Sequence, residues 1–186
     1  MGHHDHSYPP QPSPLAVAVY DNHTHLDPEV SDTDRVGQPL SMHEHLGRAS
    51  AAGVAGIVQV GTDLESSRWS AEAAARDDRV LAAVAIHPNE APRLAARGEL
   101  EDALATIDDL AGRPRVRAVG ETGLDWFRTG DDGRAAQVSS FEAHIEIAKR
   151  HGLALQIHDR QAHRGVIETL DRVGAPERTV LHCFSG

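Results

Sequence analysis

VRAVGE (116–121), RAAQVSSFEAHIEIAKRH (134–151) and LALQIH (153–158) follow one another along the chain, and this stretch decides the fold. The outer two runs are short and rich in apolar and β-branched residues, whereas the middle run repeats apolar residues at helical spacing and is followed by Gly152. The face that this helix should bury consists of Phe141, His144, Ile145 and Ala148. A strand, a helix and a second strand predict a βαβ unit with parallel strands.

The same alternation extends along the chain from Leu15. Runs predicted as strands end near residues 25, 61, 87, 121, 158 and 182. The clearest further helices are predicted over 45–52, 99–110 and 161–173. A capping box of Ser41 and Glu44 precedes the first of them. Strands that alternate with helices build a parallel sheet, either an open doubly wound sheet or a (β/α)8 barrel.

Two features favour the barrel. A nucleotide-binding doubly wound sheet would carry a glycine-rich phosphate loop after its first strand, and no such loop follows residue 25. Polar residues instead stand at the carboxyl end of nearly every predicted strand, which is where barrel active sites are built. We therefore predict an α/β fold, a TIM-type (β/α)8 barrel of which about six βα units are present, over residues 15–186. Residues 1–14, MGHHDHSYPPQPSP, combine His, Pro and polar residues without periodicity and predict a disordered leader.

The bulk composition is that of one soluble globular domain, with 40% apolar and 25% charged residues. No apolar run approaches the ~18 residues that a membrane helix needs, so we expect no membrane association. The single cysteine, Cys183, rules out an internal disulfide and fits a reducing cytoplasm. The net charge of −10 argues against a broad electrostatic surface for nucleic acid, although it does not exclude an enzyme that holds phosphate through bound cations.

The first predicted strand ends in DNHTH (21–25), and strand alternation directs Asp21, His23 and His25 to one side. In a barrel that side would be the interior. Two imidazoles two residues apart on one strand can bind a single divalent cation. The alternative is a polar strand end with surface histidines.

The fourth, fifth and sixth predicted strands end near Glu121, His158 and His182. A carboxylate that closes an apolar run is costly to bury unless it is paired or binds a cation, so Glu121 is either a ligand or a salt-bridge partner. Each histidine on its own would be a hydrogen-bonded structural residue as readily as a ligand. Together with the first strand, these residues place nitrogen and oxygen donors from four strands at one rim, which predicts a site for Zn²⁺, Mn²⁺ or a similar ion.

Seven blocks of sequence occur in the order DNHTHLD, VGTD, AIHPNE, GETGLDW, FEAHIEIAKRHGL, IHDR and HCFSG. Over roughly residues 20–186 they resemble the signature blocks of the TatD family, barrel hydrolases related to the amidohydrolases. The metal ligands that this resemblance implies are His23, His25, Glu121, His158 and His182. In that family pattern Glu121 is the carboxylate that bridges the ions. The implied cofactors are two divalent ions, Mg²⁺, Mn²⁺ or Zn²⁺.

The resemblance also gives roles to residues at the predicted rim. Asp125, in GLD, and Arg160, in IHDR, resemble residues that orient water or bind phosphate, so the catalytic roles would fall to Glu121 and Asp125. His87, in the AIHP block, would contact the substrate phosphate, or else be fixed beside Pro88 for structural reasons.

Three other residues near the predicted rim are of aromatic or nucleophilic type. Trp126 and Phe127 follow GLD and could stack on a base or close a loop over the core. Cys183 is adjacent to His182, and adjacent strand residues face opposite sides, so we expect Cys183 to pack under the helices rather than act as a nucleophile.

The activity that the resemblance implies is metal-dependent hydrolysis of DNA phosphodiester bonds by an activated water, at a single-stranded segment or a strand end. The family also supplies an aspartate ligand from its last barrel strand. This sequence stops at Gly186, just after the sixth predicted strand, so we expect the last two strands to be missing and the chain by itself to be inactive. The alternatives are a metal-dependent amidohydrolase or phosphoesterase that acts on a small molecule, and a non-catalytic fragment. No obligate protein partner is expected.

Overall fold

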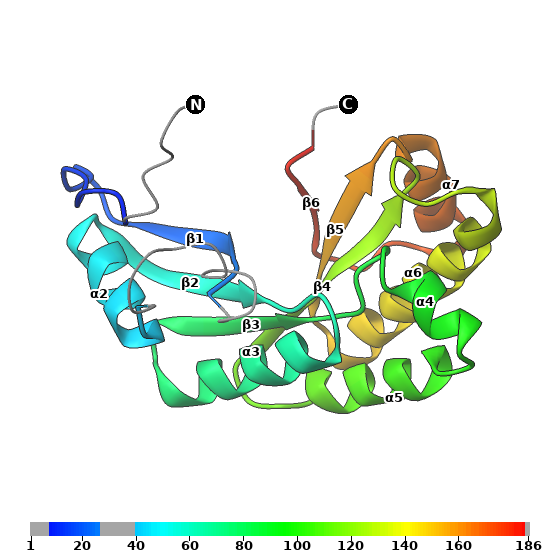
Figure 1. Cartoon of the computed structure of the whole chain (residues 1–186), viewed down its shortest axis with the longest axis horizontal. Coiled ribbons are helices and arrows are strands. Elements are labelled where there is room, and N and C mark those ends of the chain that lie inside the picture. The colour runs from blue at the N-terminus through cyan, green and yellow to red at the C-terminus, as the bar shows by residue number, and fades with distance from the viewer. Residues whose placement is uncertain (1–7, 27–39, 185–186) are drawn as a thin grey trace, which may run out of the picture.

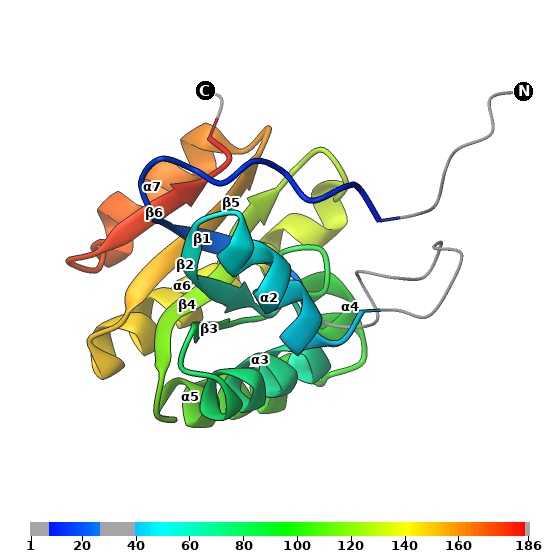
Figure 2. The same cartoon turned by 90° about the vertical axis from the view of Figure 1, so that its left-hand side faces the viewer.

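The computed structural model describes residues 8–26 and 40–184. The strands of these segments form one parallel sheet whose spatial order, β1-β2-β3-β4-β5-β6, is the order of the sequence. They are β1 (Val19–Thr24), β2 (Val54–Val60), β3 (Val80–Val84), β4 (Val116–Asp125), β5 (Ala154–Arg160) and β6 (Thr179–His182). A doubly wound sheet reverses its strand order partway, so the sequential order excludes that architecture. Figures 1 and 2 show the sheet curled into a half-barrel, which confirms the prediction of six βα units.

The helices in the described segments cover the outside of the curled sheet. They are α2 (Met42–Ala51), α3 (Leu64–Arg76), α4 (Ala91–Ala96), α5 (Leu100–Ala111), α6 (Asp131–His151) and α7 (His163–Val173). Figure 1 shows α3, α5 and α6 against the convex side of the sheet. The main core lies between these layers, and the predicted face of α6 is buried within it: Phe141, His144, Ile145 and Ala148.

Capping contacts explain where several helices begin and end. The capping box of Ser41 and Glu44 is confirmed, because Glu44 Oε2 accepts the Ser41 backbone N–H at 2.8 Å and Ser41 Oγ accepts the Glu44 N–H at 3.3 Å. α2 therefore begins at Met42, three residues before its predicted start. Asp63 caps α3 in the same way, by accepting the Ser66 N–H at 2.8 Å. This cap fixes the loop that follows β2.

The concave side of the sheet has little apolar packing of its own. Its small cluster of buried residues contains Val60, Ala83 and Ala118. Among the contacts that cross this side is a hydrogen bond from Gln156 Nε2 on β5 to the Asn22 carbonyl oxygen on β1, at 2.7 Å. β1 and β5 are not neighbours in the sheet, so this contact depends on the curl.

β1 and β6 are the edges of the sheet in the described part of the chain. Their apolar side chains are open to solvent, with Tyr20 77% exposed and Leu181 41% exposed. Cys183 is exposed as well, so the prediction that it packs under the helices is wrong. β6 ends at His182 and Cys183 takes a φ of 48° in the following turn, so strand alternation no longer sets its direction.

The predicted leader is described only from Tyr8 onward, and residues 1–7 lie outside the described part. Residues 8–14 form no helix or strand, but they contact the region of α2. The Tyr8 hydroxyl accepts the Leu40 N–H at 3.0 Å, and Gln11 Nε2 donates to the Arg48 carbonyl oxygen at 2.9 Å. Among the described residues, no helix combines the length and the apolar character needed to cross a bilayer.

Candidate metal centre

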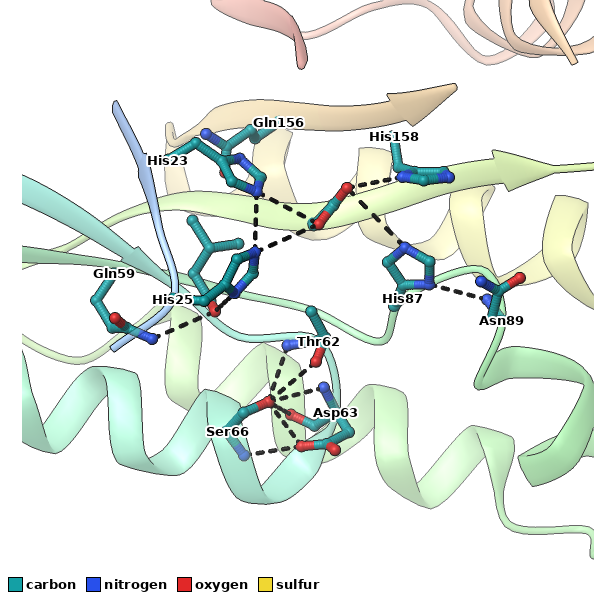
Figure 3. A network of polar contacts seen from close by, with 12 residues as sticks. His23, His25, Gln59, Thr62, Asp63, Ser66, His87, Asn89, Gln156 and His158 are labelled. Carbon is teal, nitrogen blue, oxygen red and sulfur yellow. Dashed lines mark hydrogen bonds and ion pairs between the residues drawn. The ribbon is translucent and has the colours of Figure 1, made fainter. Parts of the chain in front are cut away.

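Two histidines at the end of β1 meet a glutamate of β4. His23 Nε2 lies 3.1 Å from His25 Nε2, and Glu121 Oε2 lies 3.4 Å from the first nitrogen and 3.9 Å from the second. Figure 3 shows the two rings turned toward one point. The three donor atoms lie within 4.8 Å of one another, which is a spacing that one cation can occupy.

The other carboxylate oxygen of Glu121 faces a second pair of rings. His158 Nδ1, on β5, lies 2.7 Å from Glu121 Oε1, and His87 Nε2, from the loop after β3, lies 3.9 Å from it. These atoms form a second group with the spacing of a cation site. Glu121 is buried between the two pairs, so its two oxygens face two different sets of nitrogens. This arrangement allows one carboxylate to bridge two cations.

A backbone contact fixes which nitrogen of His25 faces the group. His25 Nδ1 lies 3.0 Å from the Val60 carbonyl oxygen, and because a carbonyl can only accept, Nδ1 carries the proton. The neutral ring then presents an unprotonated Nε2 toward His23 and Glu121. A histidine that donates its outer N–H to a backbone carbonyl is oriented as metal-binding histidines are. The donor chemistry of this group therefore fits a divalent cation.

His87 has the opposite arrangement, although its distances would allow ligation. Its Nδ1 accepts the backbone N–H of Asn89 at 3.1 Å, so the proton of the neutral ring lies on Nε2, the nitrogen that faces Glu121. Burial lowers the pKa of His87 to about 4, against the raising effect of the Glu121 charge, so the ring is neutral at pH 7. His87 thus presents a hydrogen-bond donor to the site. This favours contact with an anionic ligand over metal binding.

The hydrogen bond between Glu121 and His158 sets the charge of both groups. Burial by itself would raise the pKa of Glu121, but contacts with His158 and His23 hold it well below the usual range of a carboxyl group. Burial would lower the pKa of His158, but the Glu121 and Asp125 carboxylates raise it. Glu121 is therefore ionised throughout the neutral range, and its negative charge is available to a cation.

Asp125, at the end of β4, is held at three points. Its Oδ1 accepts the Arg128 backbone N–H at 2.9 Å, and its Oδ2 lies 3.2 Å from Asn89 Nδ2 and 3.3 Å from His158 Nε2. Burial would raise the pKa of Asp125, but these contacts lower it. The ring of His158 consequently lies between two carboxylates, those of Glu121 and Asp125.

Besides Asp125, two of the predicted site residues belong to neither group of three. The ring of His182, on β6, stacks on that of His23, with centroids 3.5 Å apart and planes at 11°, and His182 belongs to neither group of three. Arg160, the last residue of β5, is exposed, and its guanidinium carbon lies 4.1 Å from the centroid of the Phe127 ring. The roles expected for His182 and Arg160 stay predictions.

The two aromatic residues after β4 differ in their surroundings. Trp126 packs against the core, with Arg134 4.8 Å over its ring centroid and Gly165 close against its edge. Phe127 is 55% exposed. Trp126 therefore closes the loop over the core, and of the pair only Phe127 is open to contact with a ligand.

Gln137, on α6, supports the rim although no sequence pattern singled it out. Its Oε1 accepts the Asp125 backbone N–H at 3.1 Å, and its Nε2 donates to the Pro88 carbonyl oxygen at 2.9 Å and to the Thr129 hydroxyl at 2.7 Å. The side chain is fully buried. It therefore joins the loop after β3 to the end of β4.

His144 makes a similar connection two helical turns further along α6. It was predicted as part of the buried face, but its polar contacts were not. Its Nε2 accepts the Ile86 N–H at 3.1 Å, and its Nδ1 lies 2.7 Å from the Ser140 carbonyl oxygen and 3.0 Å from Thr122 Oγ1. Ile86 precedes His87 and Thr122 follows Glu121, so His144 fixes the backbone beside both. The signal available in sequence was a polar pair, Gln137 and His144, seven residues apart on an otherwise apolar face.

Comparison with known proteins identifies relatives of this chain. A family model described as "TatD related DNase" matches residues 20–186. The "Uncharacterized metal-dependent hydrolase TatD" of Mycobacterium tuberculosis is 48% identical over 174 residues, which cover 90% of this chain and 61% of the relative. The "3'-5' ssDNA/RNA exonuclease TatD" of Enterobacter lignolyticus is 33% identical over 143 residues, 75% of this chain and 52% of the relative.

Solved structures agree with the half-barrel. The crystal structure of YJJV, a TatD homologue from Escherichia coli, superposes with a TM-score of 0.72 at 28% identity and covers 90% of this chain and 60% of the other. A TatD family hydrolase from Entamoeba histolytica gives a TM-score of 0.72 at 20% identity over 92% of this chain and 60% of the other, which speaks for the fold alone. The chain therefore spans about three fifths of the length of the Mycobacterium relative and of these two structures.

Proposed function

Because the chain belongs to the TatD-related DNase family, we propose that it carries the metal centre of a hydrolase that cleaves phosphodiester bonds in single-stranded DNA. One observation carries the proposal. The two oxygens of the buried Glu121 face different sets of histidine nitrogens, contributed by separate segments of the chain. A hydrogen-bonded structural glutamate would need neither the second set nor the unprotonated nitrogen of His25.

The proposed metal ligands are His23, His25, Glu121 and His158, and His182 stays a prediction as a further ligand. Their mixture of imidazole and carboxylate donors suits Zn²⁺, Mn²⁺ or Mg²⁺, and we propose two ions. Divalent ions bound there would lower the pKa of a water molecule toward neutrality and offset the charge of the phosphoryl group.

The remaining site residues would bind and orient the substrate. His87 presents its Nε2–H to the site and would donate it to a phosphoryl oxygen, which is one of the two roles considered for it in the sequence. Asp125 keeps the His158 ring in place through the contact with Nε2 and lies where it could accept a proton from water. Arg160, at the rim, would bind a phosphate farther along the substrate.

The proposed substrate follows from the chemistry of the site and from the names of relatives. Several relatives of 31–36% identity are named as 3'-5' exonucleases of single-stranded DNA or RNA. The site combines the neutral N–H donor of His87, the carboxylates of Glu121 and Asp125 and the proposed cations, and this combination suits a phosphodiester. Location in the cytoplasm and inactivity of this chain by itself stay predictions.

Metal uptake by the 186-residue chain tests the proposal without relying on turnover. We expect calorimetric titration with Mn²⁺ or Zn²⁺ to give two ions per chain. The Glu121→Gln variant keeps the shape of the side chain and removes its charge, so it should weaken both sites by at least about tenfold. His25→Ala should weaken one site only.

Glu101→Gln is the matched control, because Glu101 is an exposed residue on α5. It should bind metal like the unaltered chain. Two normal sites in Glu121→Gln would contradict the assignment, as would a chain that takes up no divalent ion. Metal-dependent shortening of a labelled single-stranded oligonucleotide that is lost in Glu121→Gln would support the nuclease activity and contradict the prediction that this chain is inactive by itself.

The rival function is hydrolysis of a small ester or amide by the same centre. It is favoured by a cavity whose lining includes His25, His87 and Glu121 and whose volume of about 380 Å³ is that of a small-molecule site. Parallel assays with bis-p-nitrophenyl phosphate, p-nitrophenyl acetate and an oligonucleotide separate the two. Faster turnover of the acetate than of either phosphodiester would favour the rival.

A further inference from the structure

Two cavities adjoin one another at the carboxyl rim of β3 and β4. The inner cavity, of about 380 Å³, reaches outward from His25 and Glu121. The outer cavity, of about 540 Å³, lies between α4 and the loop that precedes α6. Both are lined by Asn89, Arg93 and Arg128. A chain-like ligand that extends from the metal centre would therefore pass these three side chains to enter the outer cavity.

The volumes fit a substrate built of small units. Both lie within the range of about 300–1,000 Å³ that is typical of pockets for small molecules. Each cavity has room for one nucleotide, and two adjoining cavities accept two consecutive nucleotides of an extended strand.

Arg128 is the cation of the path whose side chain has no ion-pair partner among the described residues. Arg93 pairs with Glu90, Nη1 to Oε1 at 2.7 Å. By contrast, no hydrogen bond or ion pair within residues 8–26 and 40–184 involves the Arg128 guanidinium, although the Arg128 backbone N–H is bound to Asp125 Oδ1 at 2.9 Å. Asp125 thus anchors the backbone of Arg128 beside the centre and leaves the guanidinium available to a ligand.

The charge of the outer cavity suits an anion. Its charged lining residues are Arg93, Arg128 and Asp132, and because Arg93 is paired with Glu90, Arg128 is the cation available to a ligand. Guanidinium groups bind phosphate through paired N–H donors, which makes a phosphate the ligand that the Arg128 guanidinium fits.

The other lining residues show how the ligand would be recognised. Besides polar residues the outer cavity is lined by Pro92, Ala96, Gly130 and Gly133, and its lining includes no aromatic ring. Single-stranded nucleic acid is held without base selection when the contacts are to phosphate, and base stacking needs an aromatic platform. The cavity therefore fits the sugar–phosphate backbone rather than a particular base.

We propose that the outer cavity binds the nucleotide next to the one at the metal centre, and that the Arg128 guanidinium binds the phosphate that joins the two. This inference rests on the proposed function and adds to it a two-nucleotide, base-independent subsite. A substrate with one nucleotide would leave the outer cavity and Arg128 without a partner.

Binding of a short fluorescein-labelled oligothymidylate tests the proposal, with anisotropy as the readout and EDTA present so that no hydrolysis intervenes. Arg128→Gln should weaken binding by about tenfold, since a charge-assisted contact to phosphate is lost. The slope of log affinity against log salt concentration should fall by about 0.7, the value for one phosphate contact on a single strand. Arg128→Lys keeps the charge and should keep the slope. An oligoadenylate of equal length should bind equally well.

Arg113→Gln is the control, because Arg113 is exposed and precedes β4 at the opposite end of the strand. It should leave both affinity and slope unchanged. An Arg128→Gln variant with unaltered affinity and slope would overturn the proposal, and so would an unaltered chain that binds no oligonucleotide. Metal titration separates this result from the proposed function. If the chain takes up metal normally but its oligonucleotide affinity does not depend on Arg128, only the subsite is rejected. If the affinity depends on Arg128 but the chain takes up no metal, only the metal centre is rejected.

Discussion

The histidines of β1 stand on an edge strand, whereas Glu121, Asp125 and His158 stand on two neighbouring strands inside the sheet. Nine of the ten residues of β4 are buried, and α6 packs against this strand. The first four residues of β1 are exposed. The two sets of proposed ligands are thus supported differently: α6 holds the inner strands through Gln137 and His144, while the edge strand is held by its pairing with β2 and by contacts across the concave side. This difference indicates that Glu121, Asp125 and His158 are preorganised, whereas His23 and His25 can adjust their positions.

Gly123→Ala should give the largest effect, because it disrupts the inner strands directly. Gly123 has a φ of 134°, and a Cβ there would lie 2.1 Å from the His158 carbonyl oxygen. The clash separates β4 from β5 beside Glu121 and His158. We expect urea unfolding to show a loss of at least about 4 kcal/mol, with loss of both proposed metal sites.

The control for this variant is Gly98→Ala. Gly98 also has a positive φ, 69°, but a Cβ there meets nothing within 4 Å. It should cost only about 1 kcal/mol, the strain of the backbone conformation alone. Equal losses in the two variants would show that the approach of β4 to β5 is not what limits this position.

Gln137→Leu should give the next largest effect. The substitution keeps the volume but leaves the Asp125 N–H, the Pro88 carbonyl and the Thr129 hydroxyl without their buried partner. We expect a loss of about 3 kcal/mol in urea unfolding and weaker metal binding at His158, since Asp125 is released. Ser139→Leu, on the exposed side of α6, should change stability by less than about 0.5 kcal/mol. A Gln137→Leu chain as stable as this control would mean that α6 does not organise the inner strands.

Whether a feature of the fold or of the site could be predicted from the sequence depended on how far apart in the sequence its contacting residues lie. The order of strands and helices, the buried face of α6 and the capping box at Ser41 depend on residues close in sequence, and periodicity revealed them. The gathering of His23, Glu121 and His158 was also predictable, because the carboxyl ends of parallel strands meet at one edge. These features need no knowledge of how far the sheet curls.

The unpredicted features depend on contacts between distant residues. Gln137 bonds to a carbonyl oxygen 49 residues away, and no local pattern marks that partner. The stacking of His182 on His23 follows from the curl that brings the last strand to the first. The exposure of Cys183 follows from a positive φ just after β6. In each case the deciding geometry is tertiary, so residue type and spacing could not supply it.

The pH dependence of the free energy of unfolding should test the contribution of α6 separately from that of the proposed metal ligands. Burial lowers the pKa of His144 to about 4 from its ordinary value of 6.5, so folding favours the neutral ring. The stability that it contributes is present above pH 6.5 and is lost as the pH falls from 6.5 toward 4, by at most about 1.4 kcal/mol for each pH unit. His144→Phe cannot take up this proton. Urea unfolding in EDTA should therefore give a shallower acid slope for His144→Phe than for the unaltered chain, and an identical slope would contradict the buried neutral ring.

Gln156→Leu should give the smallest effect on stability and still loosen the edge strand. It removes the hydrogen bond to the Asn22 carbonyl oxygen, but it also removes Gln156 Oε1, a buried acceptor without a partner among the described residues. The two changes oppose each other, so we expect a net change in the free energy of unfolding of less than about 1 kcal/mol. Amide hydrogen exchange should nevertheless speed up in β1 and not in β4, because only β1 loses a contact. Gln11→Leu, which removes a surface hydrogen bond to Arg48, should leave exchange in β1 unchanged. Equal acceleration in β1 and β4 would show that the edge and the inner strands open as one unit, and the contrast between adjustable and preorganised ligands would then fail.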